Sequence, residues 1–310
     1  MDVKSILKAA RLRTLPLSVS GIILGSYFGV DYLNSISSSS IKIVVWLTPI
    51  FWLAILTTIG FQVLSNFAND YGDGIKGSDK NRIGEARMVA SGAITPKQMK
   101  LIMIITTIIT LIVALLLIYL SFGKENFGYS ILFLGLGIAS IVAAIKYTVG
   151  NSAYGYSGFG DVFVFLFFGL LSVVGSYFLF TKDINFLIFL PAISIGLLST
   201  AVLNLNNLRD REEDKKNNKN TLVVKFGKNK AKFYHYSLII GALITALIYV
   251  YLNFESFSQL IFLVAFIPLL LNIKTVKQNV IPAKLDGELK KVALSTFIFA
   301  ILFSIGNTFY

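Results

Sequence analysis

The sequence predicts an all-α, polytopic integral membrane protein with about nine transmembrane helices packed around a central cavity. Hydrophobic residues make up 55% of the 310 residues, only 14% are charged, and the mean hydropathy is +0.74. Soluble domains carry about 25% charged residues, so this composition excludes an ordinary soluble domain. The formal net charge of +12 comes from short basic segments between apolar runs, and we therefore expect no nucleic-acid partner.

Nine apolar windows account for the predicted helices. Their lengths are close to the roughly 17 to 25 residues that a helix needs to cross about 30 Å of hydrocarbon. The first window could be a signal peptide, but Arg11, Thr14 and Pro16 are typical of a helix start and no A-x-A-like cleavage site follows, so we expect a span. In chain order the windows are 15–33, 43–65, 99–121, 128–148, 162–180, 185–206, 235–253, 257–273 and 292–309.

The connections between these windows fall into two kinds. The second window runs into the polar segment 66–92, and the sixth runs into the polar segment 203–231. A glycine-rich connection with Gly155, Gly158 and Gly160 precedes the fifth window, and it lacks the strand context of a dinucleotide fingerprint. Long polar segments beside membrane spans are candidate functional sites.

The basic residues predict the orientation of the chain. If the N-terminus is cytoplasmic, all but three of the 28 Lys and Arg residues fall on the cytoplasmic side, the exceptions being Lys42, Lys124 and Lys182. This bias fits the positive-inside rule. We therefore expect a multi-pass protein of the cell membrane, in contact with membrane lipids, with both long polar segments in the cytoplasm and the C-terminus outside.

The two polar segments share an arrangement of amide and acidic residues. If each helix continues past the membrane, residues at spacings of three, four or seven lie on one face. The two stripes, which end spans four helices apart, suggest a weak internal duplication. We expect a single domain, 1–310, with related halves at about 10–150 and 155–275 and a last helix at 292–309. The stripes consist of Asn66, Asp70 and Asp73 in the first segment and Asn207, Asp210 and Asp214 in the second.

Four carboxylates that face one another require a cation between them. Two like charges about 4 Å apart cost about 4 kcal/mol at an effective dielectric near 20. Oxygen ligands favour Mg²⁺ or Ca²⁺ over zinc, and Mg²⁺ commonly shares its shell with substrate phosphate. A basic rim of Arg87, Arg209, Lys215 and Lys219 then predicts a diphosphate site. A solvated helix cap is the usual interpretation of one such motif, but two on the same side favour a site.

At these residues the chain resembles the UbiA superfamily of intramembrane prenyltransferases. Asn69-Asp70-Tyr71-Gly72-Asp73 and Asp210-Arg211-Glu212-Glu213-Asp214 are similar to its two acidic motifs. The closer resemblance is to the branch that acts in menaquinone synthesis, and it covers residues 9–230. It rests on five segments in order: AARLRTLPLSVSGIILG, NDYGDGIKGSD, RMVASG, YTVGNSAYGYSGFGDVFVFLFFG and NNLRDREEDKKNNKNTLVVKFG.

The resemblance implies a reaction. A polyprenyl group would pass from polyprenyl diphosphate to 1,4-dihydroxy-2-naphthoate, with release of CO₂ and pyrophosphate. Mg²⁺ would be held by Asp70, Asp73, Asp210 and Asp214 with help from Asn66 and Asn207, while Asn69, Arg87, Arg209 and Lys215 bind substrate. Tyr147 would stabilise the allylic cation, Arg87 or Lys146 would bind the acceptor carboxylate, and Asp161 would be a site residue or a helix cap.

Two departures and two alternatives belong beside this hypothesis. Gly77 stands where many relatives have a third acid, which leaves Asp79 doubtful as a ligand, and Asn218 stands where others have an acid. The same fold could act on 4-hydroxybenzoate or homogentisate instead. A cation-coupled secondary transporter is the alternative of another class, but its acids would lie at the membrane midplane in broken helices.

Overall fold

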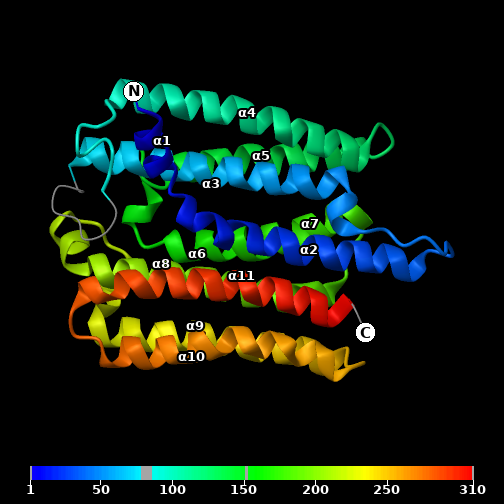
Figure 1. The fold of residues 1–310 in the computed structure, drawn as a ribbon. Helices are drawn as coiled ribbons and strands as arrows, with labels where there is room; N and C mark the ends of the chain where they lie inside the picture. Colours follow the sequence, from blue (N-terminus) through cyan, green and yellow to red (C-terminus); the bar gives the residue numbers. More distant parts are fainter. Residues whose placement is uncertain (1, 78–85, 151–152, 309–310) are drawn as a thin grey trace.

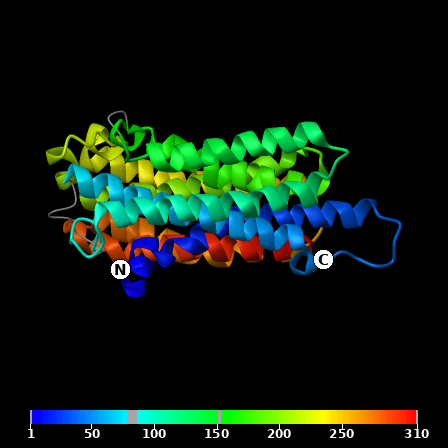
Figure 2. The ribbon, with the colours of Figure 1, turned by 90° about the horizontal axis from the view of Figure 1, so that it is seen from above.

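The computed structural model describes residues 2–77, 86–150 and 153–308. Within these ranges the regular structure is helical, as the sequence predicts. The long helices run along one direction as a single bundle, and the two ends of the chain lie at opposite ends of it (Figure 1). The view from above shows the same elongated bundle, with α1 projecting from its side near the N-terminus (Figure 2).

The longer helices follow the chain in order, and short helical turns join several of them. The turns are η1 Leu12–Thr14, η2 Val45–Leu47, η3 Tyr154–Tyr156, the π-helical η4 Phe165–Leu171, η5 Phe186–Ile188, η6 Phe257–Phe262 and η7 Pro282–Leu285. The α-helices are α1 Val3–Ala10, α2 Leu15–Ile36, α3 Pro49–Lys76, α4 Pro96–Phe122, α5 Phe127–Lys146, α6 Gly160–Val164, α7 Ser172–Thr181, α8 Phe189–Lys216, α9 Leu222–Leu252, α10 Leu263–Gln278 and α11 Asp286–Thr308.

Each of the nine predicted windows falls on a helix. In the part of the chain that the structure describes, eight helical segments are long and apolar enough to cross a membrane. The ninth, α2, has 22 residues, but its glycines, serines and Asp31 make it less apolar. It packs against α3, α7 and α11, so its smaller residues face protein more than lipid.

Several predicted boundaries were wrong at the end of the bundle that carries the polar segments. The seventh window was placed at 235–253, yet α9 begins at Leu222, and the last was placed at 292–309, yet α11 begins at Asp286. Likewise α3 and α8 extend to Lys76 and Lys216, about ten residues beyond their windows. Hydropathy marks only the lipid-facing part of a helix, whereas Lys, Glu and Gln continue it readily in water.

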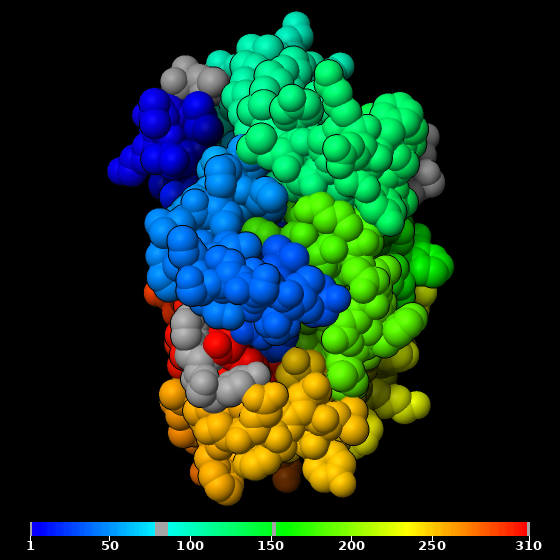
Figure 3. All heavy atoms as spheres, turned by 90° about the vertical axis from the view of Figure 1, so that its right-hand side faces the viewer, coloured from blue at the N-terminus to red at the C-terminus, as the bar shows by residue number. Residues whose placement is uncertain are grey.

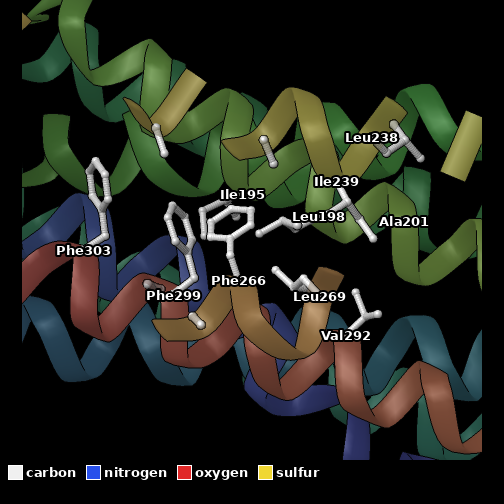
Figure 4. Close-up of a cluster of buried hydrophobic side chains, with 14 of the residues drawn as sticks. Ile195, Leu198, Ala201, Leu238, Ile239, Phe266, Leu269, Val292, Phe299 and Phe303 are labelled. Atoms are coloured by element: carbon white, nitrogen blue, oxygen red, sulfur yellow. The ribbon is translucent and has the colours of Figure 1, made fainter. Parts of the chain in front are cut away.

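The largest hydrophobic core joins α2 and α7 to the four helices from α8 to α11. Figure 4 shows Ile195 and Leu198 of α8 facing Phe266 and Leu269 of α10, with Phe299 of α11 beside them. A buried polar link crosses this core as well. The imidazole Nε2 of His235 lies 2.7 Å from Asn272 Oδ1, and Asn272 Nδ2 donates to Glu288 at 2.7 Å, which joins α9, α10 and the first turns of α11.

The two ends of the bundle differ in their connections. At the end drawn toward the viewer in Figure 3, the segment around 37–48 spreads as a blue patch between the tips of α4 and α5 and the orange end of α9 and α10. The other links at this end, 123–126, 182–185 and 253–256, contain four residues each. The polar segments after α3 and α8 lie at the opposite end (Figure 1). A relation between the two halves stays a prediction.

Candidate active site

A cavity of about 400 Å³ lies between α2, α3, α5, η4 and α8, which is a common size for a small-molecule site. Its body is apolar, and its mouth lies at the end of the bundle that carries the polar segments. The body includes Leu17, Ile22, Leu117, Ile118, Phe133 and Leu179, and the mouth includes Asn66, Asn69, Asp73, Arg87, Asn207 and Arg209.

The first predicted stripe exists because α3 continues to Lys76. Asn66, Asp70 and Asp73 are all buried on it. The carboxylate of Asp70 accepts hydrogen bonds from the backbone amides of Met88 and Val89, both at 2.9 Å. Asp70 therefore fixes the turn 88–92 against α3 and does not line the cavity.

The turn held by Asp70 brings a cation to the mouth. Arg87 immediately precedes it, is buried, and places Nη2 3.5 Å from Asp73 Oδ2. The other carboxylate oxygen of Asp73 accepts a 2.7 Å hydrogen bond from the hydroxyl of Tyr156. Asp73 thus lies on the cavity wall between a guanidinium and a phenol.

The second predicted stripe is also helical and buried, since α8 continues to Lys216. Asp210 accepts from Nε of Arg209 at 2.7 Å and from Nη2 at 2.8 Å. The remaining terminal nitrogen of Arg209, Nη1, donates to Asp286 at the start of α11. A guanidinium between two carboxylates offsets much of the acidic charge at this side of the mouth.

Tyr156 and Lys219 connect the two stripes. Lys219 Nζ lies 3.7 Å from Asp214 Oδ1 and 5.4 Å from the ring centre of Tyr156. Lys76 Nζ also approaches that ring, at 4.0 Å from its centre. Since the Tyr156 hydroxyl bonds to Asp73, the stripes of α3 and α8 face each other across one tyrosine and one lysine, as the spacing of the motifs predicts.

The residues present fit a metal ion that is shared with a ligand better than a preformed cage. Among the described residues, no three Asp, Glu, His or Cys side chains come close enough to hold a metal by themselves. Each carboxylate has its own partner, as described for Asp70, Asp73 and Asp210. Mg²⁺ commonly takes only one or two carboxylates and completes its shell with water and phosphate oxygens, so Asp73 and the α8 acids suit that role.

A row of aromatic rings runs from the mouth into the cavity. The ring of Tyr147 meets that of Tyr154 edge to face at 5.3 Å, and Tyr154 stacks on Phe163 at 4.0 Å, followed by Phe167 at 6.1 Å. All four line the cavity. Burial raises the pKa of the Tyr154 phenol, so this ring stays neutral.

The remaining predicted residues divide between the cavity and its surroundings. Asn69 lines the cavity and accepts from Thr148 Oγ1 at 3.1 Å. Asn66 and Asn207 also line it, and Asn66 donates to the carbonyl of Ala10 at 2.8 Å and so anchors the N-terminal segment. Lys146, Lys215 and Asn218 are exposed and are not part of the lining, and Asp79 lies outside the described residues.

Asp161 is not the N-cap of its helix, because α6 begins at Gly160 with Phe159 at the N-cap position and no side-chain cap. It is buried in the first turn of α6, where a carboxylate interacts favourably with the helix dipole. It does not line the cavity. The cavity lining therefore brings together Asn66, Asn69, Asp73, Arg87, Tyr147, Asn207 and Arg209. Asp70, Asp210 and Asp214 are buried but lie outside the lining, as do Lys146, Asp161 and Lys215.

Sequence reasoning missed several residues of the mouth. Tyr156 lies within YTVGNSAYGY, and Arg13 lies within AARLRTLPLSVSGIILG, so both belong to segments whose resemblance was noted without a role for them. Asp286 gave no signal, because it comes from a separate element 76 residues after Asp210. Only the packing of α11 against α8 brings it to Arg209.

Comparison with known sequences finds relatives along almost the whole chain. A family model described as the UbiA prenyltransferase family matches residues 37–303. A 1,4-dihydroxy-2-naphthoate octaprenyltransferase of Haemophilus influenzae is 41% identical over 300 residues, which cover 96% of this chain and 94% of that protein. The protein of the same name from Escherichia coli is 38% identical, with 97% and 94% covered.

Solved structures with the same fold are more distant in sequence. A UbiA homologue from Archaeoglobus fulgidus bound to GPP and Mg²⁺ superposes with a TM-score of 0.64 at 15% identity, covering 97% of this chain and 99% of that one. A digeranylgeranylglyceryl phosphate synthase superposes with a TM-score of 0.60 at 18% identity, covering 99% and 98%. These likenesses support the predicted fold around a central cavity.

Proposed function

The chain belongs to the UbiA prenyltransferase family, and from this premise we propose that it transfers a polyprenyl group from polyprenyl diphosphate to 1,4-dihydroxy-2-naphthoate. The products are demethylmenaquinol, CO₂ and pyrophosphate. The observation that carries the proposal is the cavity itself, whose apolar body opens at a mouth lined by Asn66 and Asp73 of the first stripe and by Asn207 of the second. A ligand with a long apolar tail and a polyanionic head needs both parts.

The mouth supplies what the diphosphate requires. Arg87, Arg209 and Lys219 present cations to an anion there, and charge-assisted bonds to phosphate are strong in a site with little water. Asp73, Asp210 and Asp214, joined by the amides of Asn69 and Asn207, would hold Mg²⁺. The metal ion, when bound, neutralises charge on the departing pyrophosphate. Asp70 supports this arrangement from behind through the turn 88–92.

The cavity body protects the allylic cation that forms as the C–O bond breaks. Water would quench the cation, so the apolar lining matters as much as the charged mouth. The rings of Tyr147, Tyr154 and Phe163 line the cavity. An aromatic face stabilises a desolvated cation by about 2 kcal/mol or more.

The orientation that fits this chemistry is the one that the basic residues predict. The cavity mouth and both acidic stripes face the cytoplasm, and the end drawn in Figure 3 faces outside. Lipid surrounds the apolar helix faces, so the prenyl donor reaches the cavity from the membrane while its head remains at the aqueous surface.

A product assay tests the proposal. Membranes containing the chain receive Mg²⁺, a polyprenyl diphosphate and 1,4-dihydroxy-2-naphthoate, and product mass and released CO₂ are measured. We expect a prenylated, decarboxylated naphthoquinol that disappears with EDTA. Turnover with 4-hydroxybenzoate or homogentisate instead would refute the acceptor, and no prenylated product from any aromatic would refute the enzyme.

A pair of variants tests whether the reaction takes place at the cavity mouth. Asp73→Asn removes a carboxylate from the cavity wall and should abolish turnover. Asp183→Asn is the matched control, because Asp183 is exposed in the connection at the other end of the bundle, and it should retain full turnover. Equal activity of the two variants would contradict the proposed site.

A further inference from the structure

The N-terminal corner of the chain forms part of the cavity mouth. Arg13 and Thr14 both line the cavity. The hydroxyl of Thr14 accepts from Gln62 Nε2 at 3.1 Å and from Asn66 Nδ2 at 3.2 Å. Because Gln62 and Asn66 belong to α3, the position of Arg13 is fixed relative to the first acidic stripe.

A carboxylate of the chain itself already lies between two guanidiniums there. Asp286 Oδ2 is 3.6 Å from Arg13 Nη1, and Asp286 Oδ1 accepts from Arg209 Nη1. The side chains of Arg13 and Asp286 have exposed fractions of 35% and 37%. A carboxylate at this point is therefore well bound and still reachable from the mouth.

A third cation follows on α11. Lys290 is four residues after Asp286, on the same helix face, and it also lines the cavity. The first turns of α11 are anchored to α9 and α10 by the buried link from Glu288 to Asn272 and His235. Arg13 and Arg209 thus hold one carboxylate from two separate elements, and Lys290 lies about one helical turn farther along α11, at the cavity lining.

This cluster lies beside the diphosphate position. Arg209 uses Nε and Nη2 for Asp210, on the side of the acidic stripes, and Nη1 for Asp286, on the side of Arg13. In the proposed reaction the ring carbon attacked by the prenyl group carries the carboxylate, and reacting atoms must approach to about 3–3.5 Å. The acceptor carboxylate must then bind next to the diphosphate.

We propose that Arg13 and Lys290, with Nη1 of Arg209, form the subsite for the aryl carboxylate of the acceptor, which displaces Asp286 when it binds. The inference rests on the proposed function and replaces Lys146, which lies outside the cavity lining, as the cation that recognises the acceptor. Asp286 holds the arginines in place while the subsite contains no acceptor.

The subsite fits the chemistry of decarboxylation. The C–O bond of the prenyl diphosphate breaks with its electron pair on pyrophosphate, and a ring carbon–prenyl bond forms. The bond from that ring carbon to the carboxylate then breaks, its electron pair returns to the ring, and CO₂ leaves. The carboxylate must be ionised for this step, and adjacent cations keep it so. Its negative charge ends on pyrophosphate, and charge balances.

Two inhibitors separate carboxylate recognition from ring binding. 1-Hydroxy-2-naphthoate carries the carboxylate and 1-naphthol lacks it, and the inhibition constant of each is measured for wild type and variants. We expect Arg13→Gln to raise the inhibition constant of 1-hydroxy-2-naphthoate by about tenfold or more. Lys290→Gln should raise it by about threefold, because Lys290 is exposed. Neither variant should change the inhibition constant of 1-naphthol or the KM for polyprenyl diphosphate. Arg13→Lys should restore part of the loss.

The controls keep the result interpretable. Lys284→Gln removes an exposed lysine of η7 that does not line the cavity. It should change the inhibition constant of neither compound. Asp286→Asn removes the competing carboxylate. It should therefore lower the inhibition constant of 1-hydroxy-2-naphthoate and leave that of 1-naphthol unchanged. The subsite is refuted if Arg13→Gln weakens both inhibitors equally, or raises the KM for polyprenyl diphosphate instead. Failure of wild type to prenylate dihydroxynaphthoate would refute the proposed function itself, which is a separate outcome.

Discussion

Tyr156 is the residue on which the geometry of the mouth depends most directly. Its hydroxyl donates to Asp73, and the ammonium groups of Lys76 and Lys219 both approach its ring. Tyr156→Phe keeps the ring and removes one hydrogen bond to a carboxylate, an interaction of about 1.5–3 kcal/mol. We expect turnover to fall about tenfold and half-maximal activity to need more Mg²⁺, because Asp73 loses a fixed orientation.

The measurement for Tyr156→Phe is a Mg²⁺ titration of turnover. Tyr129→Phe is the matched control, since Tyr129 lies on α5 at the far end of the bundle. An unchanged Mg²⁺ requirement in Tyr156→Phe would show that the hydroxyl does not position the carboxylate.

Asp70 differs from the other acids because its partners are backbone amides. The structure makes it the anchor of the turn 88–92, so its loss should affect folding as well as activity. In Asp70→Asn the new side-chain NH₂ group would face the backbone N–H of Met88 or Val89. Two donors would then oppose each other, at a cost of about 2–3 kcal/mol. We expect a melting temperature in detergent several degrees lower than that of Asp183→Asn. Equal melting temperatures would contradict the anchoring role.

Site residues were predictable only where they form a pattern within one short segment of the sequence. Asp73 and Asp210 stand in stripes whose helical spacing is visible in the sequence, and both stripes are buried as predicted. Their individual partners were not predictable, since Tyr156 and Asp286 reach them from other elements. Lys146 and Lys215 looked suitable by charge, but their side chains are exposed, because sequence proximity does not state which way a side chain points.

The contact between α2 and α7 depends on small residues as well as on apolar ones. Gly21, Gly25 and Gly29 recur every four residues on one face of α2, which lets the two backbones approach closely. A Cβ at Gly25 would lie 2.1 Å from the carbonyl oxygen of Val173. Backbone cannot yield as a side chain can, so Gly25→Ala should cost about 1–3 kcal/mol by overpacking.

Thermal unfolding in detergent checks the glycine contact. Gly135→Ala on α5 is the control, because an added Cβ there meets nothing within 4 Å, and its melting temperature should equal or exceed that of wild type. If Gly25→Ala were as stable as Gly135→Ala, the close approach of α2 and α7 would not contribute to the stability of the fold.

Helix positions were predictable at this scale and helix ends were not. Each apolar window contains a helix, because lipid requires a continuous apolar surface over a fixed length. Beyond the membrane that requirement ends, and α9 begins 13 residues before its window, at Leu222. The same continuation in α3 and α8 forms both acidic stripes, so the site lies in the part of the helices that hydropathy does not report.

At the scale of the whole molecule, the class and the number of spans follow from composition, whereas the cavity does not. Nine apolar runs specify a bundle, but the space of about 400 Å³ depends on which faces pack and how closely. Gly169 of η4, whose added Cβ would lie 2.6 Å from Cα of Gly196, shows how a few close contacts determine that packing. No local pattern in the sequence gives such a distance.

The orientation in the membrane is the remaining property of the whole molecule, and the chain is well suited to test it. It contains no cysteine, so a single introduced thiol is the only one that a maleimide can label. Ser39 lies in the exposed segment between α2 and α3, and Ala93 lies in the exposed segment before α4, at the opposite end. In intact cells, a membrane-impermeant maleimide should label Ser39→Cys and should label Ala93→Cys only after permeabilisation. The positive-inside bias requires this result, and it agrees with a diphosphate site that faces the cytoplasm. The reverse labelling pattern would place the cavity mouth outside the cell, and the proposed orientation would then be wrong even if the reaction were correct.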